Sequence, residues 1–159
     1  MNNMYSCFDS PLGQVTLQFN ENGILGLWFE TQTTQPAELG KRCDSAELVV
    51  QVRAQMDEYF AGNRQEFELP LAAVGTKFQN AVWQALITIP YGETISYQDL
   101  ANRIGNPKAV RAVGLANGKN PISIIVPCHR VIGKSGKLTG YAGGVDRKAQ
   151  LLKLEGALK

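Results

Sequence analysis

The chain has 159 residues, of which 44% are hydrophobic and 19% charged, and its formal net charge is +2. This composition is that of a globular protein with one domain or two small ones, and it excludes a low-complexity or disordered chain. The start of the chain lacks a basic stretch followed by an apolar one, and no apolar run reaches membrane-spanning length, so we expect a cytoplasmic protein.

Cysteine and histidine usage limits the chemistry further. The three cysteines, Cys7, Cys43 and Cys128, form no C-x-x-C pair, which argues against a disulfide framework. A single histidine, His129, cannot supply the usual mixed ligand set of zinc. We therefore expect no metal.

Charge is unevenly distributed along the chain. Residues 1–74 contain 4 Lys/Arg and 10 Asp/Glu, whereas residues 75–159 contain 12 and 4. This asymmetry predicts two domains, 1–74 and 75–159, of which the second meets a polyanion such as nucleic acid. The alternative is a solvated basic face without a partner.

The first domain is predicted to begin with strands. Three short runs have the alternation and turn signals of an antiparallel sheet, and they cover 5–8, 15–19 and 24–29. A polar loop follows over 30–42. Asp44 and Glu47 have capping-box spacing and predict a helix to about Phe60, and Phe67 and Leu69 predict a last strand.

The second domain is predicted to be mainly helical. Thr76 caps an apolar helix over 78–89. Ser96 begins a short helix, 97–104, and Asn106-Pro107 begins the next one, which ends near Gly118. Two short helices with a tight connection fit a helix-turn-helix, and a purely structural helix pair is the alternative.

Three features follow in the basic half. Lys108 and Arg111 are three residues apart and should share a helix face. The segment 133–137, which includes Lys134, fits a wing that contacts phosphate or a plain solvated turn. A final helix is predicted from Val145 to Glu155.

The segment before the histidine carries the clearest chemical signal. The apolar run 122–126 predicts a buried strand that ends at Pro127. Cys128, His129 and Arg130 come next, and a thiol beside cationic groups is a candidate nucleophile. The alternative is an inert buried cysteine.

Neighbouring side chains in an extended segment point to opposite sides, so His129 should not take the proton of Cys128 directly. A bridging water with an acid that orients the imidazole would solve this, and so would a local turn. The acid is left open among Asp99, Asp146 and Glu155.

Several motifs together resemble the O6-alkylguanine-DNA alkyltransferases. The shared segments span most of residues 76–156 in order, and they are Gly92-Glu93-Thr94-Ile95-Ser96-Tyr97, 106–114, Asn120-Pro121, Pro127-Cys128-His129-Arg130-Val131 and 139–144. Residues 1–74 resemble the family's ribonuclease-H-like domain in the order of their strands and helix. The resemblance implies an α/β (α+β) protein with a small antiparallel sheet, a helix and a C-terminal winged helix-turn-helix domain.

The resemblance also implies a reaction. Cys128 would take the alkyl group from O6-alkylguanine, and from O4-alkylthymine, in double-stranded DNA. His129, through water and with Glu155, would remove the thiol proton, and Tyr97 would protonate the departing guanine. The thioether has no route back to thiol, so each molecule would act once, without a cofactor. Asn120 would organise hydrogen bonds behind the cysteine.

Arg111 would enter the base stack in place of the flipped nucleotide. The ordinary alternatives are core packing for Tyr97, a phosphate contact for Arg111 and a turn residue for Asn120. The other residues implied to line the DNA contact are Lys108, Gln98, Asn106, Ala109, Val110, Ala112, Gly114 and Lys134. The residues implied to form the alkylguanine pocket are Val131, Tyr141, Ala142 and Ser123.

Two positions differ from some relatives, which have proline in place of Ser123 and serine in place of Ala142. We expect a roomier pocket as a result. The chain lacks the zinc site of certain relatives and the methyl-phosphotriester domain of others, which predicts a stand-alone, monomeric repair protein, with cooperative DNA binding left open. Other functions to weigh are a helix-turn-helix regulator or lesion sensor, and a Cys-His hydrolase.

Overall fold

The computed structural model describes residues 2–32, 34–136, 138, 141 and 144–158. The chain divides into two compact units. Unit 1 is Met1–Ala73 together with Pro121–Ser123, and unit 2 is Val74–Asn120 together with Ile124–Lys159. The chain thus returns briefly to unit 1 just before its cysteine-histidine segment. No helix in the described part of the chain is both long and apolar enough to cross a membrane.

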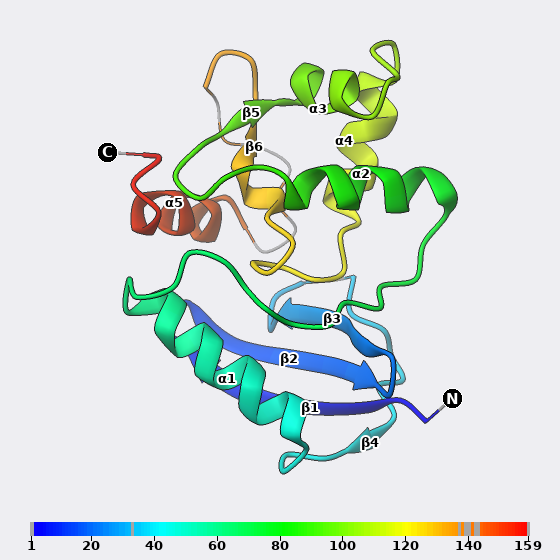
Figure 1. The fold of residues 1–159 in the computed structure, drawn as a ribbon, viewed down its shortest axis with the longest axis vertical. Coiled ribbons are helices and arrows are strands. Elements are labelled where there is room, and N and C mark those ends of the chain that lie inside the picture. The colour runs from blue at the N-terminus through cyan, green and yellow to red at the C-terminus, as the bar shows by residue number, and fades with distance from the viewer. Residues whose placement is uncertain (1, 33, 137, 139–140, 142–143, 159) are drawn as a thin grey trace. The chain divides into compact units, whose positions relative to one another are not determined.

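Unit 1 is a four-stranded sheet with one helix packed against a face (Figure 1). Its strands are β1 (Met4–Ser10), β2 (Gly13–Asn20), β3 (Gly23–Phe29) and β4 (Lys41–Arg42), in the order β3-β2-β1-β4. The first three are antiparallel, as their alternation and turn residues predict, and β4 pairs parallel to β1. Helix α1 (Glu47–Phe60) buries Val49, Val52, Met56 and Tyr59.

Three local predictions for unit 1 differ from the structure. The strand β4 was not predicted, because two exposed residues carry no periodic pattern. The strand expected at Phe67 and Leu69 is absent, and in its place Leu71 forms an isolated bridge with Ile24. The capping box at Asp44 is also wrong: α1 begins at Glu47, and Asp44 instead accepts hydrogen bonds from Ser6 and Arg42.

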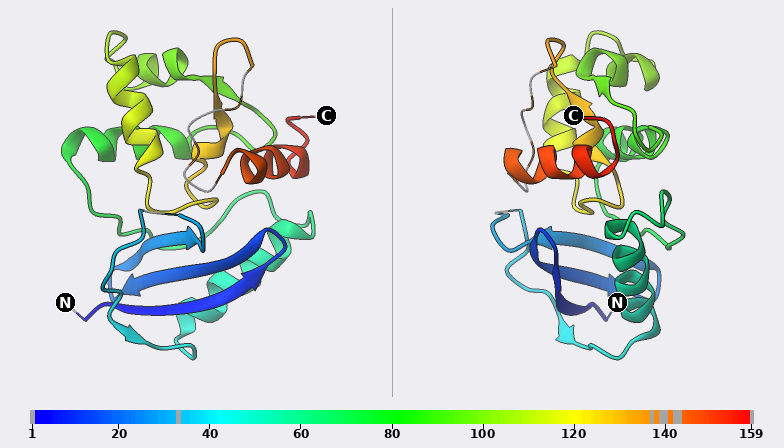
Figure 2. Two further views of the ribbon diagram at one scale, coloured as in Figure 1. Left: turned by 180° about the vertical axis from the view of Figure 1, so that it is seen from behind. Right: turned by 90° about the vertical axis from the view of Figure 1, so that its left-hand side faces the viewer.

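Unit 2 gathers short helices around a two-stranded parallel sheet. The elements are α2 (Lys77–Ile87), β5 (Ile95–Ser96), α3 (Tyr97–Arg103), α4 (Val110–Gly118), a 3-10 helix (Cys128–Arg130), β6 (Val131–Ile132) and α5 (Val145–Leu154). The predicted caps of α2 and α3 are confirmed, since Thr76 and Ser96 each form a capping box. Trp83 of α2 donates its indole N–H to Ala116 O of α4 at 2.9 Å. Figure 2 shows α3 and α4 side by side.

Helix α4 begins later than predicted. Ala109 N donates to Asn106 O, which closes a turn over 106–109, and Ala109 is the N-cap of a helix that starts at Val110. Pro107 therefore lies in the turn and not at the first helical position. Lys108 precedes the helix, so the prediction that it shares a helix face with Arg111 is wrong.

The buried strand predicted over 122–126 is also wrong. The run is buried as expected, yet only Ile122 forms a bridge, with Leu27, and the chain then turns. Ile124 has a φ of +70°, which no strand permits. An apolar run reports burial and does not by itself fix the backbone conformation.

Candidate active site

Cys128 opens the 3-10 helix of unit 2 and is 5% exposed. Its backbone N–H donates to Val126 O at 2.8 Å. Burial raises the pKa of the Cys128 thiol, while a hydrogen bond with the Asn120 side chain and the charge of Lys148 act in the opposite direction. The thiol is therefore held beside two groups that favour its thiolate form.

Asn120 holds the backbone of the segment that leads into Cys128. Its Nδ2 donates to Val126 O at 2.9 Å, and the side chain is 3% exposed. The same amide thus contacts both the cysteine and the segment that leads into it. The prediction of a hydrogen-bond organiser at this position agrees with that geometry.

His129 is completely buried next to the cysteine. Its Nε2 lies 2.8 Å from Glu155 Oε2. Burial lowers the pKa of His129, although Glu155 acts to raise it. A neutral imidazole that donates from Nε2 to a carboxylate has a free lone pair on Nδ1. This Nδ1 is buried without a hydrogen-bond partner in the part of the chain that the structure describes.

Glu155 also pairs with a buried cation, Arg130. Arg130 donates from Nε to Oε1 at 2.8 Å and from Nη2 to Oε2 at 3.0 Å. Arg130 Nη1 also donates to Ile89 O at 2.7 Å. Burial by itself would raise the pKa of Glu155, but the hydrogen bonds from His129 and Arg130 outweigh it and lower the pKa to about 2. Glu155 thus stays ionised and orients the imidazole, and of the three candidate acids it is the one whose hydrogen bond to His129 the structure describes.

Lys148 is a fifth buried ionisable group in this cluster. It is 0% exposed on α5, and its Nζ donates to Val131 O at 2.5 Å. Burial lowers the pKa of Lys148 to about 8, with Cys128 acting to raise it. Sequence reasoning missed both Lys148 and the role of Arg130. A signal was present: Lys148, Leu151, Leu152 and Glu155 follow helical spacing, so two charges lie on an apolar stripe.

The residues expected to contact DNA lie on α3, on α4 and in the turn between them, except Lys134, which follows β6. Arg111 and Ala112 are exposed on α4. Gln98 Nε2 donates to Pro107 O at 3.0 Å and so ties α3 to the turn before α4. Tyr97, the first residue of α3, packs near Gly114 of α4. Of the remaining predicted contacts, those that are exposed are Asn106, Lys108 and Lys134, and those that are half-buried are Ala109, Val110 and Gly114.

The predicted pocket residues are placed differently from one another. Val131 is buried in β6, and Tyr141 is 7% exposed with its ring centroid 6.5 Å from that of His129. Ser123 belongs to unit 1, where its hydroxyl donates to Gln32 Oε1 at 3.1 Å. Ala142 lies outside the described residues.

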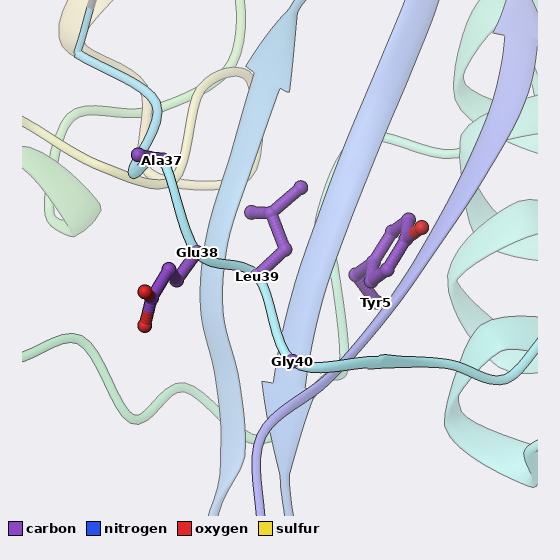
Figure 3. Close-up of a pocket in the computed structure, with 5 residues that line it drawn as sticks. All are labelled: Tyr5, Ala37, Glu38, Leu39 and Gly40. Carbon is purple, nitrogen blue, oxygen red and sulfur yellow. The ribbon is translucent and has the colours of Figure 1, made fainter.

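A hollow in unit 1 does not carry this chemistry. It measures about 450 Å³ and is lined by Tyr5, Ala37, Glu38, Leu39 and Gly40 (Figure 3). None of these side chains is a thiol, an imidazole or a cation that could activate a nucleophile. The candidate active site is therefore the buried cluster around Cys128.

Comparisons with known proteins agree with this geometry. Residues 3–73 match the family model described as the ribonuclease-like domain of 6-O-methylguanine DNA methyltransferase, and residues 77–157 match that described as its DNA binding domain. The methylated-DNA--protein-cysteine methyltransferase of Methanosarcina acetivorans is 50% identical over 153 residues, which are 96% of this chain and 98% of the relative. That of Mycobacterium tuberculosis is 52% identical over 151 residues, 95% of this chain and 91% of the relative.

Solved structures give the same result. The crystal structure of Mycobacterium tuberculosis OGT in complex with DNA has a TM-score of 0.91 at 50% identity and covers 97% of this chain and 93% of its own. The crystal structure of Mycobacterium tuberculosis O6-methylguanine methyltransferase has a TM-score of 0.89 at 49% identity and covers 99% and 94%.

Proposed function

Because the chain belongs to the 6-O-methylguanine DNA methyltransferase family, we propose that it repairs O6-alkylguanine, and O4-alkylthymine, in double-stranded DNA by moving the alkyl group to Cys128. The observation that carries this proposal is the buried hydrogen bond between His129 and Glu155. His129 directly follows Cys128 on the 3-10 turn that begins with that cysteine. A regulator or sensor has no need of a buried acid-base pair beside a thiol.

The proton of the thiol is taken up by the imidazole. With Nε2 donating to Glu155, the free lone pair on His129 Nδ1 is the base, and a bridging water carries the proton from Cys128. The ionised carboxylate fixes the tautomer and stabilises the imidazolium that forms. Lys148 and Asn120 stabilise the thiolate in a setting where burial opposes it.

The transfer itself is a displacement at carbon. Cys128 Sγ forms a bond with the alkyl carbon, the bond from that carbon to guanine O6 breaks, and its electron pair stays on the base. Tyr97 supplies a proton to a ring nitrogen of the departing guanine. The product is a thioether, which cannot return to thiol, so each molecule reacts once and no cofactor takes part.

The lesion must leave the base stack before the thiol reaches it. Arg111 is exposed on α4 and would occupy the space that the flipped nucleotide vacates. The backbone of Cys128, Val131 and Ala142 would read the guanine edges, with a pocket that is roomier than in relatives with proline in place of Ser123. We also propose that the protein acts as a monomer in the cytoplasm.

The decisive experiment is an incubation with duplex DNA that contains O6-methylguanine, followed by the intact protein mass. We expect one methyl group in place of one proton, located on Cys128 and saturating at one per molecule. Cys128→Ser should gain none. DNA binding without transfer would identify a sensor or regulator, and repeated turnover of an ester or peptide would identify a hydrolase.

A further inference from the structure

The chain reaches Cys128 through a short segment that belongs to unit 1. In this segment Ile122 forms a parallel bridge with Leu27 of β3, the edge strand of the sheet. Leu27 N donates to Pro121 O at 2.8 Å, and Ser123 N donates to Leu27 O at 3.0 Å. The segment is therefore held on the sheet of unit 1 only five residues before the nucleophile.

A buried side chain, Gln32, fixes the end of this segment. Gln32 is 6% exposed, and its Oε1 accepts from Phe29 N at 2.7 Å and from Ser123 Oγ at 3.1 Å. One oxygen thus ties the end of β3 to Ser123. Its Nε2 is buried without a hydrogen-bond partner within the described ranges. Burying an amide N–H group without a partner costs free energy. The two hydrogen bonds that the amide oxygen accepts offset this cost and keep the side chain in place.

The residue after Ser123 has a strained backbone. Ile124 is the non-glycine residue with a positive φ, +70°, among those described, and it is 1% exposed. A β-branched residue in this region costs about 1–3 kcal/mol and persists only where its surroundings enforce it. On the far side of the turn, Asn120 holds Val126 O. On the near side, Ser123 is held by its backbone N–H, which donates to Leu27 O, and by its hydroxyl, which donates to Gln32 Oε1.

We propose that Gln32 is a positioning residue for alkyl transfer, which holds Ser123 and thereby maintains the strained turn that sets the place of the Cys128 thiol. This inference rests on the proposed function, because it takes Cys128 as the alkyl acceptor. On this inference, unit 1 influences alkyl transfer through the backbone that connects Ser123 to Cys128.

Single-use chemistry gives a clean test with Gln32→Ala. The label bound at saturation measures the folded, active fraction, and the second-order rate constant measures how well the thiol is placed. With free O6-benzylguanine as the probe, we expect a saturation near one label per folded molecule and a rate constant about tenfold lower than that of the wild type. Repair of O6-methylguanine in duplex DNA should slow by the same factor, because the defect lies at the thiol.

Gln18→Ala is the matched control. Gln18 is also 6% exposed in unit 1, and its Nε2 donates to Leu39 O. This variant should lose stability but keep the wild-type rate constant. Ser123→Ala removes the Gln32 contact from the other side and should slow transfer as well, even if Gln32→Ala fails to fold. The double variant should react no more slowly than the slower of the two single variants. Both substitutions remove the same hydrogen bond, from Ser123 Oγ to Gln32 Oε1, so their effects on the rate should not add.

Three results overturn the inference without touching the proposed function. The first two are an unchanged rate constant in both Gln32→Ala and Ser123→Ala, and an equal loss of rate in Gln18→Ala. A lower saturation with an unchanged rate constant does so as well, because it reports folding and not placement. A wild-type protein that takes no methyl group from O6-methylguanine in duplex DNA overturns the proposed function, and this inference falls with it.

Discussion

The two units bury polar side chains of different kinds. Among the described residues of unit 1 the buried polar ones are all neutral, and they are Ser6, Thr16, Gln18, Asn20, Gln32 and Ser123. In the described part of unit 2 they include four ionisable groups, His129, Arg130, Lys148 and Glu155. Removing a charge from water costs several kcal/mol unless a partner compensates. Unit 2 therefore carries an electrostatic cost that unit 1 avoids.

This difference indicates where the chemistry lies. A neutral amide such as Gln18 needs only a hydrogen bond to be buried at little cost. The cluster around Cys128 instead combines a carboxylate with pKa lowered to about 2 and a lysine with pKa lowered to about 8. Opposite charges are held in place before any substrate arrives, which is typical of a site that stabilises charge during a reaction.

The largest effect expected is that of breaking the buried ion pair. Glu155→Ala leaves Arg130 buried without its carboxylate and should lower the free energy of unfolding by about 3–5 kcal/mol. Urea unfolding at pH 7 measures this. Glu93→Ala removes an exposed carboxylate of the same unit and should change stability by less than about 0.5 kcal/mol. Similar losses in both variants would contradict the comparison between buried and exposed charge.

Acid should weaken the same pair without a mutation. Glu155 has a folded pKa of about 2 against an ordinary value of 4.5. Because the folded value is depressed, the stabilisation is complete above pH 4.5 and is lost as the pH falls toward 2. The loss should amount to about 3 kcal/mol. Urea unfolding between pH 6 and pH 2.5 measures it, and Glu155→Gln should flatten that part of the profile. A wild-type profile as flat as that of the variant would show that Glu155 is not the group responsible.

An exposed cation should behave differently from the buried ones. Arg111→Ala should slow repair in duplex DNA by about 100-fold, because it removes the side chain that we propose replaces the flipped nucleotide in the base stack. Reaction with free O6-benzylguanine and the free energy of unfolding should remain at wild-type values. Lys119→Ala removes an exposed cation at the other end of α4 and should have a much smaller effect. Equal losses on duplex and free base would contradict the base-flipping role.

Sequence patterns predicted the regular elements well and the irregular ones poorly. Strands β1 to β3 have clear alternation, and α2 and α3 have capping boxes that the structure retains. The 3-10 turn at Cys128 and the late start of α4 at Val110 depend on single turns closed by backbone bonds. Such turns leave no periodic signal in the sequence. The strand expected over 122–126 failed for this reason, although its burial was predicted.

The site residues also fall into those that the sequence predicted and those that it did not. Motifs placed Cys128, His129 and Glu155 in one centre, and the structure brings the last two within 2.8 Å. Propensity reasoning assigns charged residues to the surface, so it missed the buried Lys148, which only the helical spacing with Leu151 and Leu152 indicates. Nothing in the sequence pairs Arg130 with Glu155. Gln32 is separated from Ser123 by 91 positions in the chain. Only the folded sheet of unit 1 brings these two residues together.

The smallest effect is expected for Lys148→Met, a variant that should slow alkyl transfer while changing stability little. Lys148→Met keeps the length of the side chain but removes the charge that favours the Cys128 thiolate. We expect transfer to free O6-benzylguanine at pH 7 to slow by about tenfold. The lysine is buried with its pKa depressed, so it is charged at pH 7 at a cost to the fold. That cost disappears in the variant and offsets the lost bond to Val131 O. Urea unfolding should therefore show far less destabilisation than in Glu155→Ala. A large loss of stability with an unchanged transfer rate would show that Lys148 supports the fold and not the thiolate.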